Sequence, residues 1–219
     1  EWSRGLGDVY KRQQSVRRMD ILALLNWNLP TLLEIFPSFP GRILIVSAGD
    51  PMWRGALSGP DSLYVHAERP LISEDGTSPL LHEMVHVAMA ARSGARSDWL
   101  VEGLAEYYSI ELLRRGRAIT EERASTAFAE QAAWAADAAN LCGAESTAAT
   151  TALAVTVFAT LNRELGEVSG GERSLDDLLP AIVDSNVDLA SLTAAAEQLI
   201  GATPDALHID NLPGCRKMP

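Results

Sequence analysis

Two histidines four residues apart, His82 and His86, stand in an otherwise apolar stretch, and this pair constrains the fold more than any other feature of the sequence. Residues four apart lie on one face of an α-helix, so a helix here would bring both imidazole rings to one point. A surface helix with two free histidines is the alternative, but burial of the apolar neighbours would leave those polar rings unpaired. The pattern therefore predicts a buried helix whose histidines share a metal ion. The apolar neighbours are Leu80, Leu81, Met84, Val85, Val87 and Ala88.

Two histidines alone make an incomplete metal site, because a catalytic zinc ion usually has three protein ligands and an open position for water. The next predicted helix carries Glu102 and Glu106 one turn apart. Fifteen residues separate His86 from Glu102, and they include the turn-prone pair Ser93 and Gly94, so the chain has room to reverse. We expect Glu102 to be the third ligand and Glu106 to accept the second ring N–H of a ligand histidine.

Glu83 directly follows the first histidine and points about 100° around the helix axis from it. In that position it can reach a water molecule at the metal without being a ligand itself. We expect Glu83 to act as the general base, which takes a proton from the attacking water and returns it to the leaving amine. These residues together predict a zinc-dependent hydrolase with one Zn²⁺ ion held by His82, His86 and Glu102.

Apolar spacing and chain breakers predict a mostly helical protein with two strands. The β-branched run at 42–47 and the segment 62–67 are short and bounded by turn-prone residues, which is typical of strands. Helical spacing covers 16–36, where Pro30 is a break or a new helix start. Further helices are expected at 79–93, 98–115, 121–140, 146–165, 174–185 and 187–200.

This pattern gives an α+β fold dominated by helix. We expect one catalytic domain over 15–219, in which 15–78 forms a mixed helix and strand region and 79–219 forms a helical lobe. The segment 1–14, EWSRGLGDVYKRQQ, resembles a translated sequencing adapter and is expected to be non-native, so it is left out of the fold prediction.

Composition excludes several classes of partner. A formal net charge of -11 predicts a surface that repels phosphate backbones and anionic headgroups, so neither nucleic acid nor a membrane surface is expected to bind. The apolar runs are too short and too interrupted for a membrane-spanning segment. Two cysteines, Cys142 and Cys215, are too few for a disulfide framework or a cysteine zinc site. A disulfide between them and two free thiols are equally open.

The motifs HEMVH at 82–86 and WLVEGLAEYY at 99–108 resemble the gluzincin metallopeptidases, the thermolysin-like group with two histidines and a glutamate on zinc. The segments 111–120 and 170–178 are similar to the glycyl aminopeptidase branch of that group, and the likeness covers roughly 75–212. The resemblance implies a thermolysin-like catalytic domain, a peptide or protein substrate and an exported, extracytoplasmic protein. It also implies that the strand at 62–67 binds substrate backbone along its edge, although a plain structural strand fits equally well.

The sequence departs from that family in two respects. Relatives usually have a tyrosine that stabilises the oxyanion on a helix before the segment GGERSLDD, and the stretch 150–162 contains none. Tyr64, Tyr107 and Tyr108 are the candidates to replace it. The large N-terminal β-domain of the family is also missing from the sequence. Both departures favour the first alternative to a peptidase, a catalytically weak or inactive binding or scaffold domain with the same fold. A metal-dependent hydrolase of a non-peptide amide or ester is the second alternative.

Overall fold

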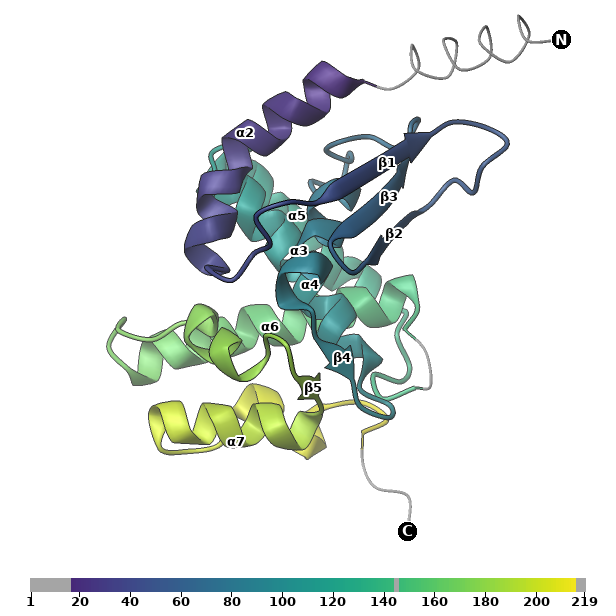
Figure 1. Ribbon diagram of the computed structural model, residues 1–219. Coiled ribbons are helices and arrows are strands. Elements are labelled where there is room, and N and C mark those ends of the chain that lie inside the picture. Colours follow the sequence, from purple (N-terminus) through teal and green to yellow (C-terminus); the bar gives the residue numbers. More distant parts are fainter. Residues whose placement is uncertain (1–16, 144–145, 216–219) are drawn as a thin grey trace, which may run out of the picture.

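The computed structural model describes residues 17–143 and 146–215 (Figure 1). The segment 1–14, expected to be non-native, lies outside these ranges. The first part of the chain contains one helix and a small sheet: α2 (Arg18–Ile35), β1 (Leu44–Ala48), β2 (Ala56–Gly59) and β3 (Ser62–His66). The longer second part is helical: α3 (Pro79–Met89), α4 (Asp98–Arg115), α5 (Glu121–Ala135), α6 (Ala148–Val168) and α7 (Leu189–Ile200). The prediction of a mostly helical α+β fold with a small sheet is confirmed.

The three strands form a sheet in the order β1-β3-β2, with β1 parallel and β2 antiparallel to β3. Leu63 and Val65 of β3 are buried in the core, whereas Val46 and Leu57, which flank Tyr64 on the opposite face, are largely exposed. Since β3 is paired on both sides, it cannot bind substrate along an edge, and that expectation was wrong. The edge strands of this sheet are β1 and β2, and β2 is a four-residue strand that the sequence did not predict.

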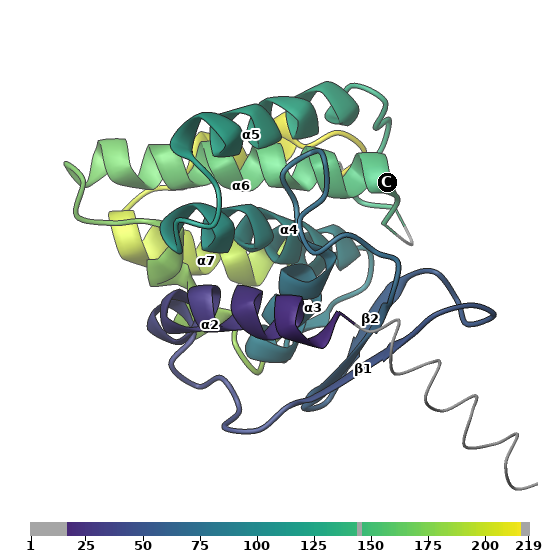
Figure 2. The same ribbon diagram turned by 90° about the horizontal axis from the view of Figure 1, so that it is seen from above.

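Helix α3 lies between the sheet and helix α4, and it contacts β2 and β3 on one side and α4 on the other. Helices α5 and α6 run side by side and cover the far side of α4 (Figure 2). Gly103 lets α4 approach α6 closely, because a Cβ atom at this position would lie 2.3 Å from the Cβ of Ala154. Next to it, the ring of Trp99 stacks on Phe158 with a centroid separation of 6.0 Å. The packing fixes α4, which carries the predicted carboxylate ligand, against the helical lobe.

Several helices differ from the prediction, and α5, for example, ends at Ala135 instead of residue 140. Helix α3 ends at Met89 instead of residue 93, because Ala90 adopts a left-handed conformation with φ 45°. Strand β4 (Arg92–Ser93), which follows α3, pairs with β5 (Asn186–Val187), so the backbone after Ala90 makes its hydrogen bonds in a sheet. The helix expected at 174–185 is a 3₁₀ helix, η1 (Leu175–Ala181). Helix α2 continues without interruption through Pro30.

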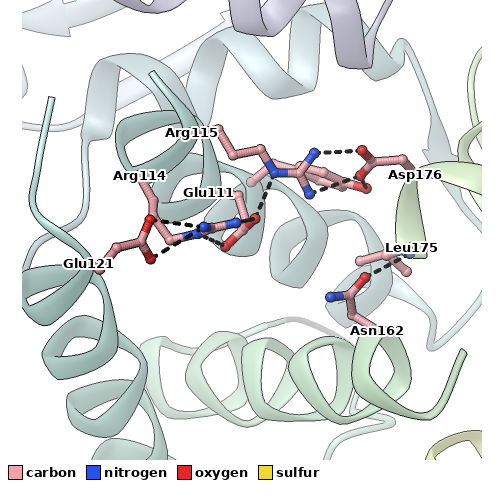
Figure 3. Close-up of polar contacts among 8 residues, drawn as sticks. Glu111, Arg114, Arg115, Glu121, Asn162, Leu175 and Asp176 are labelled. Carbon is pink, nitrogen blue, oxygen red and sulfur yellow. Dashed lines mark hydrogen bonds and ion pairs between the residues drawn. The ribbon is translucent and has the colours of Figure 1, made fainter. Parts of the chain in front are cut away.

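The two family-like segments at 111–120 and 170–178 meet at the end of α4 (Figure 3). Glu111 accepts hydrogen bonds from Arg114 at 2.9 Å and from Arg115 at 2.7 Å, and Arg115 also donates to Asp176 at 2.5 Å. Tyr108 donates its hydroxyl hydrogen to Asp176 as well, at 2.9 Å. This network ties α4 to η1 through groups that lie far apart in sequence.

Cys142 and Cys215 form a disulfide, which answers the question that the sequence left open. Nearby, the guanidinium of Arg96 donates to the carbonyl oxygen of Cys142 at 2.8 Å and to that of Gly214 at 3.3 Å. These contacts join the α5–α6 connection, the approach to α4 and the end of the described chain. Within the described ranges, no helix has the length and hydropathy needed to cross a membrane.

Candidate metal centre

Helix α3 carries the two histidines in the orientation that their spacing predicts. The helix begins at Pro79, and the Oγ atom of its N-cap residue Ser78 accepts a hydrogen bond from the backbone N–H of Leu81 at 3.3 Å. One turn into the helix, the Nε2 atoms of His82 and His86 lie 3.1 Å apart. Both side chains are largely buried, so the two nitrogens face a shared space rather than bulk water.

Helix α4 adds the carboxylate of Glu102 to this space. One oxygen of Glu102 lies 3.4 Å from the Nε2 atom of His82, and the other lies 3.4 Å from the Nε2 atom of His86. Ligands at about 2.0–2.1 Å from a tetrahedral zinc ion are about 3.3 Å from one another. The two nitrogens are 3.1 Å apart and each has one Glu102 oxygen at 3.4 Å, which is close to that value, so these three residues could hold a single ion.

Glu106, one turn after Glu102, approaches the other nitrogen of the first histidine. Its Oε2 atom lies 2.8 Å from the Nδ1 atom of His82 and also accepts a hydrogen bond from the hydroxyl of Ser109 at 3.4 Å. A neutral His82 that donates from Nδ1 to this carboxylate keeps the lone pair of Nε2 for a metal. Glu106 thus sets the tautomer that a ligand histidine needs.

The site has the electrostatic character of a cation site. Burial by itself lowers the pKa of His82, but hydrogen bonds to Glu102 and Glu106 outweigh it and raise the pKa to about 10. Burial likewise raises the pKa of Glu102, yet its hydrogen bonds to His82 and His86 bring the pKa well below its ordinary value. The carboxylates therefore stabilise positive charge at this point, and a divalent cation would experience the same field.

Glu83 is 7% exposed and lines two cavities that meet at the cluster of histidines and Glu102. The first cavity, of about 540 Å³, extends towards α5 and is also lined by Trp53, Gln131 and Trp134. The second, of about 560 Å³, extends along the edge strand β2 and is lined by Ala56, Leu57 and Ser58, among others. A ligand can therefore reach the cluster from two sides, and the carboxylate of Glu83 belongs to both walls.

The three tyrosines considered for the oxyanion lie elsewhere. Tyr108 is fully buried and donates to Asp176, and Tyr107 is buried against the rings of Tyr108 and Phe128. Burial raises the pKa of both phenols. Tyr64 donates to the carbonyl oxygen of Trp53 at 2.8 Å. Among the described residues, none of the three lines either cavity at the cluster.

The other two histidines stay outside the cluster. His66 is buried at the end of β3, where its Nδ1 atom accepts a hydrogen bond from the backbone N–H of Glu68 at 3.3 Å. His208 is exposed, with its Nδ1 atom 3.8 Å from a carboxylate oxygen of Asp210. The sequence-based expectation named neither as a ligand.

Sequence reasoning missed the residues that form the cavity towards α5. Gln131 lies in an alanine-rich helix whose composition gives no sharp polar and apolar faces, so its burial could not be foreseen. Trp53 and Trp134 can be recognised in the sequence as aromatic residues. Their place in the same cavity as His82 becomes apparent only in the folded structure, where both are largely exposed.

Comparison with known proteins finds a likeness at the level of the fold. No family model matches the sequence, and no curated protein matches it. The structure is similar to an aminopeptidase N family protein from Idiomarina loihiensis, with a TM-score of 0.61 and 14% identity over 91% of this chain and 41% of that one. It is also similar to an M1 zinc metallopeptidase from Deinococcus radiodurans, with a TM-score of 0.59 and 19% identity over 88% of this chain and 44% of that one. A mutant of the latter protein gives the same values.

The chain thus spans less than half the length of these proteins. At such low identity the likeness shows that this chain has the fold of one part of an M1 metallopeptidase. It supports the resemblance to metallopeptidases that the two sequence motifs suggested.

Proposed function

We propose that this chain is a zinc-dependent peptidase in which His82, His86 and Glu102 hold one Zn²⁺ ion. The observation that carries the proposal is the convergence of two imidazole nitrogens, 3.1 Å apart, with a carboxylate from a second helix whose two oxygens each lie 3.4 Å from one of those nitrogens. Zinc is the metal to test because structurally similar proteins are zinc metallopeptidases and the donor set of two imidazoles and one carboxylate suits that ion. A bound zinc ion would supply Lewis-acid chemistry, polarising a carbonyl group and lowering the pKa of a water ligand towards 7.

The side chains around the cluster supply the remaining functions. Glu83 lines both cavities and is placed to take a proton from water and to return it to the leaving amine. Glu106 holds His82 in the tautomer that leaves Nε2 free. The carboxylates of Glu102 and Glu106 stabilise the positive charge that a metal ion brings.

The position of β2 favours a peptide substrate over a non-peptide ester or amide. It is an edge strand that pairs with β3 on one side and with no other described strand, and its residues Ala56, Leu57 and Ser58 line the cavity that Glu83 and His86 also line. An extended peptide can add to such an edge by backbone hydrogen bonds. The scissile bond of a peptide bound in this way would lie beside the metal ligands.

Glu83→Gln tests the proposal most directly at the level of chemistry. The substitution removes the proton acceptor and keeps the side-chain shape, so zinc binding should stay stoichiometric while hydrolysis of a mixed peptide library falls by about 10²- to 10⁴-fold. Glu172→Gln, at an exposed position far from α3 and α4 in sequence, is the matched control and should keep full activity. Unchanged hydrolysis in the Glu83 variant would remove this residue from the mechanism.

The same digest, with and without a chelator, distinguishes the alternatives. Cleavage only next to a free amino terminus would indicate an aminopeptidase, and peptides that begin with glycine belong in the library because of the likeness to the glycyl aminopeptidase branch. Internal cleavage would indicate an endopeptidase. A protein that binds zinc stoichiometrically but cleaves neither peptides nor simple esters and amides would be a binding or scaffold domain.

A further inference from the structure

Gln131, on helix α5, has a buried amide nitrogen without a partner in the described structure. The residue is 2% exposed, and its Nε2 atom is inaccessible to solvent and makes no hydrogen bond within the described structure. A buried polar group without a partner destabilises a protein, because it gives up its hydrogen bonds to water and gains none in return. An apolar side chain of similar size would suit a purely structural position better.

Helix α5 presents this amide to the segment that leads into the metal-ligand helix. Ala127, one turn before Gln131 and therefore on the same face, packs against Gly76, where a Cβ atom would lie only 2.8 Å from the Cβ of Ala127. Another turn earlier, Arg123 donates to the carbonyl oxygen of Ser73 at 3.1 Å. The face of α5 that carries Gln131 is therefore held against residues 73–77, immediately before α3.

Gln131 lines the cavity of about 540 Å³ together with His82, Glu83 and Glu102. Position distinguishes it from the other described residues that have a buried polar side-chain atom without a partner. None of these lines either cavity at the cluster; they are Asn28, His66, Trp99 and Ser146. Among the described residues, Gln131 alone thus combines an unsatisfied amide nitrogen with a place in the wall of the candidate active site.

We propose that Gln131 is a substrate-binding residue whose side-chain amide forms hydrogen bonds with the backbone of a peptide bound in this cavity. The inference rests on the proposed function, since it assigns a peptide to the same site. A carboxamide carries one carbonyl acceptor and two N–H donors, so it can pair with either or both groups of a peptide bond. Trp53 and Trp134 line the same cavity, are largely exposed and give its mouth an apolar character that suits a peptide with a large apolar side chain.

The test measures binding without turnover, in zinc-loaded Glu83→Gln protein. The probe is an alanine pentapeptide with a central phenylalanine, and its dissociation constant is measured by calorimetry. Adding Gln131→Met, an apolar replacement of similar length, should weaken binding about 3- to 10-fold, the value of one neutral hydrogen bond. The zinc dissociation constant should be unchanged, and the thermal midpoint should be equal or higher because the unsatisfied amide is gone. Gln198→Met, at an exposed position on α7, is the matched control and should bind the probe as before.

A second variant covers the case in which Gln131→Met does not fold. Gln131→Asn keeps an amide but shortens its reach, so probe binding should again weaken while zinc affinity stays the same. Equal probe affinity in the parent protein and in the folded variants would overturn the inference, and so would a parent protein that does not bind the probe. Failure of the proposed function is a separate result, namely wild-type protein that binds zinc and the probe but never hydrolyses it.

Discussion

Helix α4 carries two carboxylate clusters that satisfy their charge in opposite ways. Near its end, Glu111 receives hydrogen bonds from Arg114 and Arg115, and Arg115 also pairs with Asp176, so this cluster contains its own cations (Figure 3). One to two turns from its start, the carboxylates of Glu102 and Glu106 make their polar contacts in the described structure with the histidines of α3 and with Ser109. Within the described chain, neither of them pairs with lysine or arginine. Carboxylates of the same helix are thus paired with permanently charged arginines in one place and, in the other, with histidines that can exchange a proton for a metal ion.

The largest effect is expected where that external cation would bind. Glu102→Gln removes the charged ligand, so zinc affinity should fall by more than about 100-fold, beyond the loss that a supporting residue causes. The measurement is a zinc competition titration with a chromophoric chelator. Zinc affinity equal to that of the wild type would mean that the two histidines bind the metal without this carboxylate.

Glu106→Ala should have a smaller effect on the same quantity. The variant loses the acceptor for Nδ1–H of His82 but keeps all three ligands, so zinc should bind about 10- to 100-fold more weakly. The same titration checks this, and Glu172→Ala, an exposed position outside α4, serves as the control. An unaltered dissociation constant would remove Glu106 from the support of the metal site.

Glu111→Gln should separate the two clusters. It leaves Arg114 and Arg115 without their shared carboxylate, and since both arginines are partly exposed we expect a loss of about 1–3 kcal/mol in the free energy of unfolding. Zinc affinity should not change, because Glu111 lies about two and a half helical turns from the ligand carboxylate of Glu102. Denaturant titration and zinc competition measure the two quantities, and a weakened zinc site in this variant would show that the clusters are coupled.

The smallest expected effect is the pH dependence of that loss. Burial by itself raises the pKa of Glu111, but the hydrogen bonds from Arg114 and Arg115 outweigh it and lower the pKa below its ordinary value of 4.5. A carboxylate with a lowered pKa stabilises the fold above its unfolded-state pKa, and this contribution is lost as the pH falls through the lower, folded value. The stability difference between wild type and Glu111→Gln should therefore be full at neutral pH and shrink in acid. A difference that stays constant into that acid range would contradict the pairing.

How far the sequence predicted the site depends on how local each feature is. The positions of His82 and His86 on one face follow from helix geometry alone. The same geometry places Glu102 and Glu106 on one face of the next helix, which provides the carboxylates of the site. The reversal between the two helices also involves the pairing of β4 with β5, whose residues lie about ninety positions later in the sequence. Nothing in the neighbouring sequence predicts that strand pairing or the left-handed conformation of Ala90 that ends α3.

The fold was predicted best where periodicity was long and worst where elements were short. Strand β2 has four residues, two of them Ser58 and Gly59, and it lacks the β-branched run that revealed β1. The tyrosines of α4 were considered as substitutes for the missing oxyanion tyrosine, but the partner of Tyr108, Asp176, is 68 residues away and could not be predicted. The importance of Gln131 could not be predicted for the same reason, since α5 packs against α6, α4 and the segment before α3, which lie far apart in the sequence.

The central claim is that two helices bring three side chains to one zinc ion and leave a position open for chemistry. Anomalous diffraction at the zinc absorption edge, from crystals grown with stoichiometric zinc, tests it most directly. The account predicts one strong peak at about 2.0–2.2 Å from the Nε2 atoms of His82 and His86 and from a carboxylate oxygen of Glu102, with a non-protein ligand completing the coordination. A peak elsewhere, or a zinc ion with four protein ligands at this point, would contradict it.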